Sequence, residues 1–225
     1  SWDIKKYRAR THASVSARHF PQGKATIFSI QEAYFEKIRG DTTITSGRQI
    51  LDWFPQENFW YLGKLNGLRS FSLTEEENEG LIGLRFKRKM WGGQLTAFGS
   101  LLYLPELNPG YTFRDGEIIG NNEWSRMPPT EISFREGRAP VKFDLIAPDI
   151  QKLVSQRTFG VNFRKDLDWL QVSLFGIVKP EAKLRSGACG YYEQINDEAA
   201  KMRIRGFALR HSVYGGYLNF PLGGD

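Results

Sequence analysis

The sequence predicts an all-β protein, an antiparallel, up-and-down transmembrane β-barrel of the bacterial outer membrane. Two observations favour this class. Apolar and polar residues alternate over many strand-length segments, and short turns alternate with long polar connections from the third connection onward. Because successive side chains of a strand point to opposite faces, each segment has one apolar and one polar face. In a transmembrane barrel the apolar face meets lipid and the polar face lines the lumen.

The first three strands are expected near the beginning of the chain. The first covers 7–18, where one face reads Tyr7, Ala9, Thr11, Ala13, Val15, Ala17 and the other reads Arg8, Arg10, His12, Ser14, Ser16, Arg18. The segments 25–37 and 42–53 are rich in strand-forming residues but mix polar and apolar residues on both faces. The orientation of these two strands therefore stays open.

The later strands are expected over 82–87, 95–103, 158–164, 170–178, 202–208 and 214–220. Together with the first three they make about nine, whereas single-chain bacterial barrels have an even number of strands. The last residues, 220–225, are typical of the beginning of a loop. We therefore expect an incomplete portion of a larger barrel, with a count that is wrong by one as the alternative.

The 225 residues are expected to form one domain, since no linker or shift in composition divides them. The mean hydropathy of -0.44 and the absence of an apolar run near 20 residues exclude a helical membrane protein. The connection 104–156 is too long for a plain loop and contains a candidate hairpin, 130–134 with 141–143. We expect it to fold into the pore or over its mouth.

The net charge of +6 is compatible with nucleic acid, anionic lipid or an anionic solute as partner. The cations lie on the polar faces of the expected strands instead of in one run, which favours a basic lumen over a nucleic-acid surface. The alternative is structural, with these cations paired to Glu32, Glu36 or loop acids. The candidate pore-lining residues are Arg8, Arg10, Arg18, Arg85, Lys87, Arg164, Arg203 and Arg205.

Catalytic, metal and cofactor sites are not expected. His12, His19 and His211 have no metal-ligand spacing with each other or with Cys189, the single cysteine. His12 and Ser14 share a strand face, but two such residues do not make a catalytic triad. We therefore predict a protein that is not an enzyme.

Aromatic residues lie near the expected strand ends, among them Trp53, Trp91, Trp169 and Tyr214. Amphipathic rings favour the headgroup zone of a membrane, so some of these residues are expected to form interfacial girdles. The alternative is that they pack in loops over the rim of the barrel.

A short motif in the first third of the chain resembles a known family. Gly47-Arg48-Gln49 is followed by Trp53, with Gln31-Glu32-Ala33-Tyr34 before it and Leu65-Asn66 after it. This pattern resembles early strands of Gram-negative outer-membrane porin-like proteins of the alginate-export type, in which a Gly usually follows the Trp. Phe54-Pro55 follows it here. The resemblance implies an outer-membrane channel with Arg48 on the lumen side.

The expected function is therefore passive diffusion of small anionic solutes through an outer-membrane porin, with membrane lipid and these solutes as partners. A soluble or secreted β-barrel ligand-binding module is the alternative. In that module the apolar faces would point inward around a ligand, and Arg8, Arg10, Arg203 and Arg205 would face solvent.

Overall fold

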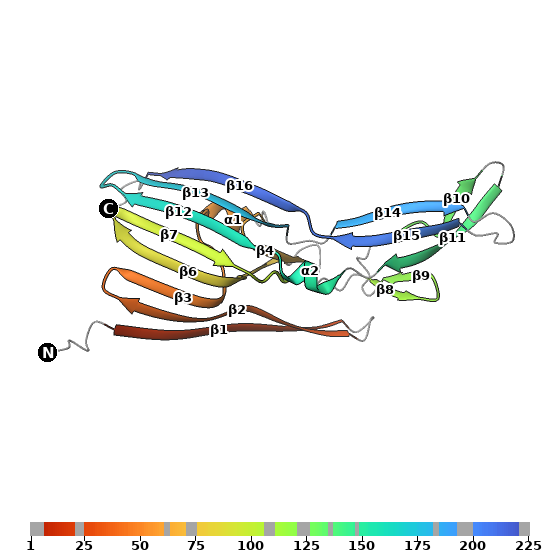
Figure 1. Ribbon diagram of the computed structural model, residues 1–225, viewed down its shortest axis with the longest axis horizontal. Coiled ribbons are helices and arrows are strands. Elements are labelled where there is room, and N and C mark those ends of the chain that lie inside the picture. The colour runs from red at the N-terminus through yellow and green to blue at the C-terminus, as the bar shows by residue number, and fades with distance from the viewer. Residues whose placement is uncertain are drawn as a thin grey trace.

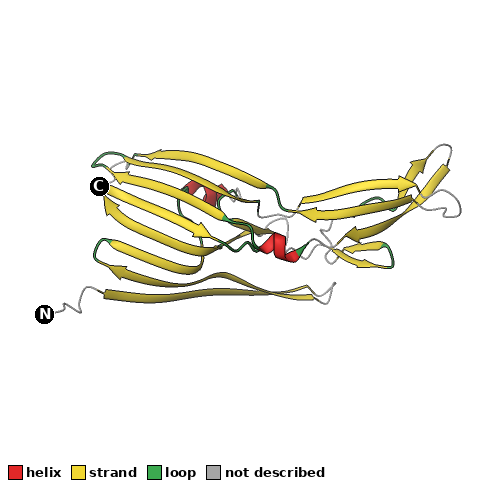
Figure 2. Ribbon diagram, viewed as in Figure 1, coloured by secondary structure: helices red, strands yellow, loops and turns green. Residues whose placement is uncertain are grey.

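The structure is a computed structural model that describes residues 7–20, 25–60, 64–70, 76–105, 111–120, 127–134, 137–146, 149–181, 185–192 and 200–220. Strands dominate it, and both helices are short: α1 (Pro55–Trp60) and α2 (Ile150–Val154) (Figure 2). The all-β prediction is confirmed. Within the described part of the chain, no helix is long and apolar enough to span a membrane.

The largest unit is an eight-stranded sheet in which every neighbouring pair is antiparallel. Its strands, in spatial order, are β1 (Tyr7–Phe20), β2 (Ala25–Arg39), β3 (Thr42–Gln49), β6 (Leu81–Met90), β7 (Gly93–Ser100), β12 (Thr158–Asp166), β13 (Gln171–Pro180) and β16 (Arg210–Asn219). In the described residues β1 and β16 are its two edges, so these strands do not close a barrel.

A second, four-stranded sheet continues from the end of the first along the long axis of the molecule (Figure 1). It consists of β10 (Glu131–Phe134), β11 (Gly137–Ile146), β15 (Ala200–Phe207) and β14 (Arg185–Tyr192), and β11 pairs in parallel with β15. Two ribbons complete the structure: β4 (Gly67–Ser70) with β5 (Glu76–Glu79), and β8 (Tyr111–Arg114) with β9 (Glu117–Gly120).

From β2 onward, short turns and long connections belong to opposite ends of the eight-stranded sheet. Residues 40–41, 91–92 and 167–170 form short turns at one end, at the left in Figure 1, whereas the longer connections, between β3 and β6, β7 and β12, and β13 and β16, begin and end at the other end. In the turn 91–92, Trp91 has φ 54° and Gly92 has φ 68°. Positive φ at both central residues is typical of the tight turns that match the twist of a hairpin. From β3 onward, this arrangement agrees with the alternation seen in the sequence.

The structure corrects three expected elements. The strand 202–208 belongs to β15 in the second sheet, so the main sheet has eight strands instead of nine. The residues 210–212 do not turn between paired strands, because β16 pairs with β13 and β15 with β14. The third strand ends at Gln49, before Trp53. The expected hairpin in 130–143 is confirmed as β10 and β11.

Candidate functional site: the polar face of the eight-stranded sheet

The eight-stranded sheet has two chemically different faces. We call the face with the directly paired residues Thr45, Arg85 and Phe98 the inner face, and the opposite face, with Ile44, Phe86 and Ala97, the outer face. The expected faces of the first strand are confirmed in register: Arg10 pairs with Glu36 on the inner face. The register also assigns the two strands that the sequence left open.

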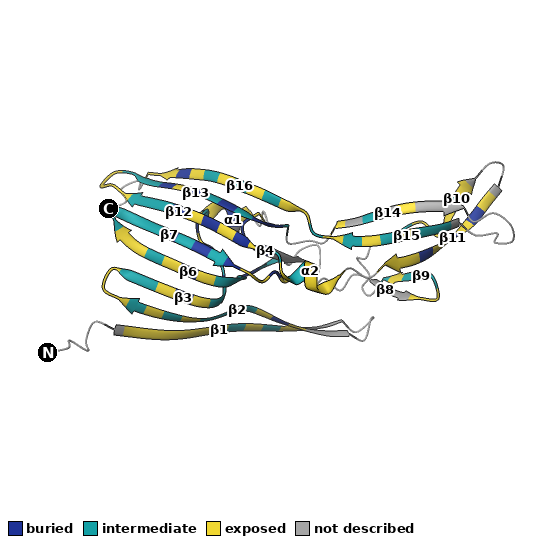
Figure 3. Ribbon diagram, viewed as in Figure 1, coloured by how far each residue is buried: buried dark blue, intermediate teal, exposed yellow. Residues whose placement is uncertain are grey.

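Burial on these faces is the reverse of that in a water-soluble sheet. On the outer face Phe28, Phe159 and Leu174 are exposed to 71%, 61% and 61%. On the inner face Thr45 and Thr96 are buried to 0% and 2% exposure. Buried residues recur at every second position from Thr158 to Asn162 in β12 and from Ser173 to Lys179 in β13 (Figure 3). Large apolar side chains thus face outward from most of the strands, while hydroxyls and amides are covered on the inner face together with a few apolar side chains.

The described residues between β3 and β4, 50–60 and 64–66, lie against the inner face; we call them the segment 50–66. Its Leu51, Trp53 and Leu65 form a buried cluster with side chains of β7 and β13, namely Phe98, Phe175 and Ile177. Trp53 was expected near a strand end, among aromatic residues that form interfacial girdles or pack in loops, and it is 2% exposed inside this cluster. The segment that lies against the inner face is thus 50–66, whereas the described part of 104–156 contributes β8, β9, β10, β11 and α2.

Buried polar contacts hold this segment in place. The Asn66 side chain donates to Leu51 O at 3.0 Å and accepts from Leu51 N at 2.8 Å. Glu57 Oε1 accepts from the backbone N–H groups of Lys64 and Leu65 at 2.7 and 2.9 Å. Lys179 of β13 donates from Nζ to Leu65 O at 2.6 Å. Since buried polar groups are costly without partners, these contacts favour a single position of the segment.

Large rings on the inner face lie over glycines of neighbouring strands. A Cβ added to Gly83 would lie 2.6 Å from the Phe98 ring, and one added to Gly215 would lie 2.6 Å from the Phe175 ring. A Cβ on Gly160 would lie 2.8 Å from the Trp53 ring. Each glycine therefore provides a socket for one ring, and any side chain there would displace it.

Cations gather on the inner face towards the short-turn end. Arg85 and Lys87 lie two residues apart on β6 and share a contact with Asp52, with Arg85 Nη1 and Lys87 Nζ at 3.8 and 4.0 Å from Asp52 Oδ1. The Arg85 side chain is 8% exposed, and among the described residues its Nε has no hydrogen-bond partner. The Asp52 carboxylate is 62% exposed. This pair of cations is thus only loosely neutralised by protein.

The structure brings together part of the predicted pore-lining set. Arg8, Arg10, Arg85, Lys87 and Arg164 all lie on the inner face by register. Arg18 is in β1, but its side chain lies outside the described residues. Arg203 and Arg205 lie in β15, away from the eight-stranded sheet, and Arg203 forms an exposed ion pair with Asp144.

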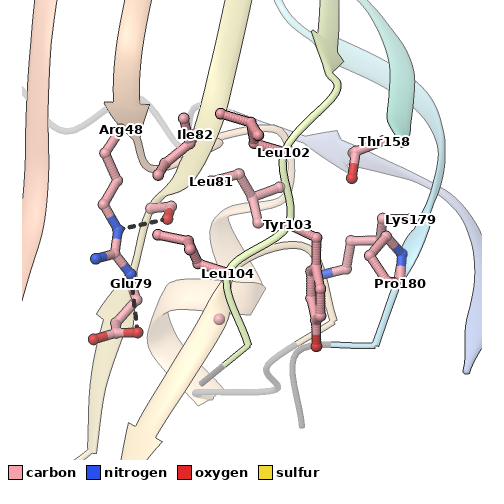
Figure 4. Close-up of a pocket in the computed structure, with 12 residues that line it drawn as sticks. Arg48, Glu79, Leu81, Ile82, Leu102, Tyr103, Leu104, Thr158, Lys179 and Pro180 are labelled. Carbon is pink, nitrogen blue, oxygen red and sulfur yellow. Dashed lines mark hydrogen bonds and ion pairs between the residues drawn. The ribbon is translucent and has the colours of Figure 1, made fainter. Parts of the chain in front are cut away.

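Arg48 lies where β2 and β3 stop pairing. Its register places it with Ala33 and Ile82, on the outer-face side. The guanidinium donates from Nε to Gly80 O at 2.9 Å and from Nη2 to Glu79 Oε2 at 3.0 Å (Figure 4). Glu79 also accepts a hydrogen bond from Ser29 at 2.8 Å. Arg48 therefore links β3 to the end of β5, and Glu79 links it in turn to Ser29.

Further charged residues of this face were missed in the sequence. Lys89 lies two residues after Lys87 on β6, and Lys179 lies six residues after Ser173, on the same face of β13. Period-two alternation continued to the ends of these strands would have found both of them. Asp52 lies beyond the end of β3, where no strand pattern applies.

The residues His12 and Ser14 remain separate in their contacts. His12 Nε2 lies 3.6 Å from Glu32 Oε2, and its ring lies 5.3 Å from that of Tyr34. The Ser14 hydroxyl donates to Gln31 Oε1 at 2.9 Å instead of to His12. Across the part of the chain that is described, no three His, Cys, Asp or Glu side chains gather as a metal site. In comparisons with protein-family models, curated proteins and solved structures, nothing matches this chain.

Proposed function

We propose that this chain forms wall strands of a bacterial outer-membrane pore that passes small anionic solutes by diffusion. The observation that carries the proposal is the reversed burial of the eight-stranded sheet. In water, exposure of a continuous apolar face opposes folding, whereas in lipid the same exposure is favourable. Leu84, Phe159 and Leu174 are exposed to 53%, 61% and 61% on the outer face. These side chains are the lipid-facing residues in this proposal.

The dimensions of the strands support a membrane location. β6, β13 and β16 have 10 residues each and β12 has 9. A strand tilted by about 45° needs about 9–11 residues to cross the apolar core of a bilayer. Short turns at one end and long connections at the other are typical of bacterial barrels, in which the short turns are periplasmic.

In the described residues β1 and β16 are open edges, so a closed pore requires further strands. Backbone groups in lipid must be hydrogen bonded within protein, and an open edge leaves a row of them unpaired. We therefore propose that further strands, from a longer chain or from another copy, complete the wall. The inner face would then line a lumen that the segment 50–66 narrows.

The charge of the inner face supports a preference for anions. The acids of the eight strands are Glu32, Glu36 and Asp166, and the inner-face cations outnumber them. Rings of Arg and Lys favour anions in pores because they raise the local anion concentration. Arg85 and Lys87 lie beside Asp52 of the narrowing segment. At this point a passing anion would come closest to fixed positive charge.

The alternative, a soluble ligand-binding barrel, is weaker on the same evidence. Its apolar faces would turn inward to hold a ligand, and its cations would turn to solvent. Here the covered face holds Arg85 and Lys179, at 7% and 1% exposure, and the apolar face is open. The reversed burial therefore favours lipid as the surrounding medium.

Bilayer conductance tests the proposal. The full-length natural chain, reconstituted in planar bilayers under a salt gradient, is expected to give stepwise conductance with anion preference. The double variant R85Q/K87Q should move the reversal potential towards cations, and D52N should move it the opposite way. R203Q is the matched control, because Arg203 lies in the second sheet and should leave the potential unchanged. A protein that stays monomeric in water without detergent and never conducts would support the soluble module instead.

A further inference from the structure

The charges on the outer face are confined to its two ends. In the described eight strands, Glu32, Glu36 and Asp166 all lie on the inner face, so the outer face has no acidic residue. Its cations at the short-turn end are Lys37, Arg39, Arg88 and Lys165. At the other end are Arg48, which is paired with Glu79, and Arg210. The apolar belt between these ends contains no charged residue in the described strands.

Strand register places the short-turn cations near one level. Arg39 pairs with Thr42, Thr42 with Arg88, and Arg88 with Leu95. Leu95 pairs in turn with Phe163, two residues before Lys165. Lys37 lies two residues further from the turn than Arg39. We call Lys37, Arg39, Arg88 and Lys165 the basic band.

Aromatic side chains border the basic band. Trp91, in the turn after β6, is 74% exposed, and its ring lies 6.4 Å from the ring of Phe163 on the outer face. Trp169 is 66% exposed, and its ring lies 6.3 Å from that of Phe220. Lys165 lies beside the same turn, since a Cβ on Gly92 would be 3.8 Å from Lys165 Cε. Exposed tryptophans and the cations of the basic band thus lie together at the short-turn end of the apolar belt.

We infer that the basic band binds the headgroups of anionic phospholipids in the leaflet at the short-turn end. The inference rests on the proposed membrane location. Tryptophan rings favour the headgroup level, and cations beside them meet the phosphates of that level. Charge complementarity makes the occupant anionic. Lys37 and Arg39 also have contacts within the protein, so the lipid headgroup is expected to contact mainly Arg88, which is exposed, and Lys165. Each cation near an anionic surface should strengthen binding about fivefold.

The two faces of β6 separate this role from that of the lumen. Lys87 and Arg88 are neighbours in the sequence, but they lie on the inner and the outer face respectively. Lys87 contacts Asp52 at 4.0 Å on the lumen side. Arg88 is exposed on the lipid side. A substitution at one position should therefore leave the function of the other unchanged.

The test uses the full-length natural chain in phosphatidylcholine vesicles that contain a small amount of spin-labelled lipid. The relative association constant of labelled phosphatidylglycerol against labelled phosphatidylcholine is measured by electron paramagnetic resonance. We expect a preference for phosphatidylglycerol that falls about fivefold in R88Q and further in R88Q/K165Q. It should weaken at high salt, because exposed charges are screened.

Two controls keep the outcome decisive. R88K, which keeps the charge, should retain the lipid preference, and K87Q should retain it while losing part of the anion preference in conductance. A protein that inserts and conducts but shows equal association with both lipids, or one in which R88Q/K165Q changes nothing, would overturn the basic band alone. A protein that enters neither bilayers nor vesicles would overturn the proposed pore as well.

Discussion

In the four-stranded sheet β10-β11-β15-β14, Val141 and Phe143 are 7% and 8% exposed, whereas in the eight-stranded sheet Leu84 and Leu174 are 53% and 61% exposed. The first pair packs against Ile118 of β9 and Ile132 of β10, so ribbon and sheet cover an apolar core together. The eight-stranded sheet has covered its polar face with the segment 50–66 and left its apolar face open.

Strand alternation alone therefore does not decide what a sheet buries. Both sheets alternate with period two, and the difference lies in which face receives a covering segment. In water a sheet covers its apolar face, as the four-stranded sheet does with Val141 and Phe143. The eight-stranded sheet makes the opposite choice, and the proposed membrane location rests on that difference.

The largest expected effect breaks the inner cluster of the eight-stranded sheet. W53A removes a ring that is 2% exposed, and loss of a buried Trp costs about 3–5 kcal/mol. We expect the segment 50–66 to lose protection against hydrogen exchange and the single-channel conductance to rise. W60A is the control, because Trp60 is 66% exposed in α1. Unchanged exchange and conductance in W53A would mean that this cluster does not hold the segment.

The next effect tests the two sheets against each other. L174R places a charge on the apolar outer face, where a cation near the bilayer midplane costs about 2–4 kcal/mol. Ile119 in β9 is also exposed, to 43%, but it belongs to the ribbon beside the second sheet. Denaturant titration of the protein refolded in vesicles should show a loss of stability in L174R and almost none in I119R. Equal losses in both variants would contradict the assignment of the outer face to lipid.

The smallest effect concerns the junction between the sheets. Glu181 N donates to Leu209 O at 2.7 Å, and Tyr103 Oη donates to Glu181 O at 2.6 Å. Hydrogen bonds from Arg185, at 2.6 and 2.9 Å, lower the pKa of the Glu181 carboxyl. A carboxyl with a lowered folded pKa contributes stability above its unfolded pKa and loses it as the pH falls through the folded value.

We therefore expect the backbone amide hydrogen of Glu181 to lose some protection at acidic pH, so that it exchanges slightly faster than the change in intrinsic exchange rate alone predicts. The effect should be small, since the ion pair is exposed and screened. In R185Q this pH dependence should be absent, and a wild-type dependence that survives in R185Q would exclude the ion pair as its source. Exchange at amides of β7 is the internal reference.

The sequence predicted most of the strands because the two faces of a strand follow from the local alternation of apolar and polar residues. Period-two alternation located the strands of the main sheet and the faces of 7–18 without knowledge of their partners. The strand 202–208 has the same local pattern, yet it pairs with β14 and β11. The choice of partner depends on residues far away in the chain, which a local pattern does not contain.

The candidate site was predictable only in part, for a similar reason. Arg85, Lys87 and Arg164 follow from alternation, but Trp53 turns inward because of contacts such as that between Lys179 and Leu65, which are 114 residues apart. Asp52, the carboxylate beside the cations, is placed by the same inward turn. The position of a segment between strands depends on such long-range contacts.

The ring sockets at Gly83, Gly160 and Gly215 have a consequence for assembly. A slip of one residue between two strands exchanges their faces and is opposed by the hydrophobic pattern, but a slip of two residues preserves the faces. After a two-residue slip of β7 along β6, the ring of Phe98 would lie over the side chain of Leu81 or of Arg85 instead of over Gly83. The glycine sockets therefore disfavour a misregistered hairpin, even when the shift keeps the apolar and polar residues on their correct faces.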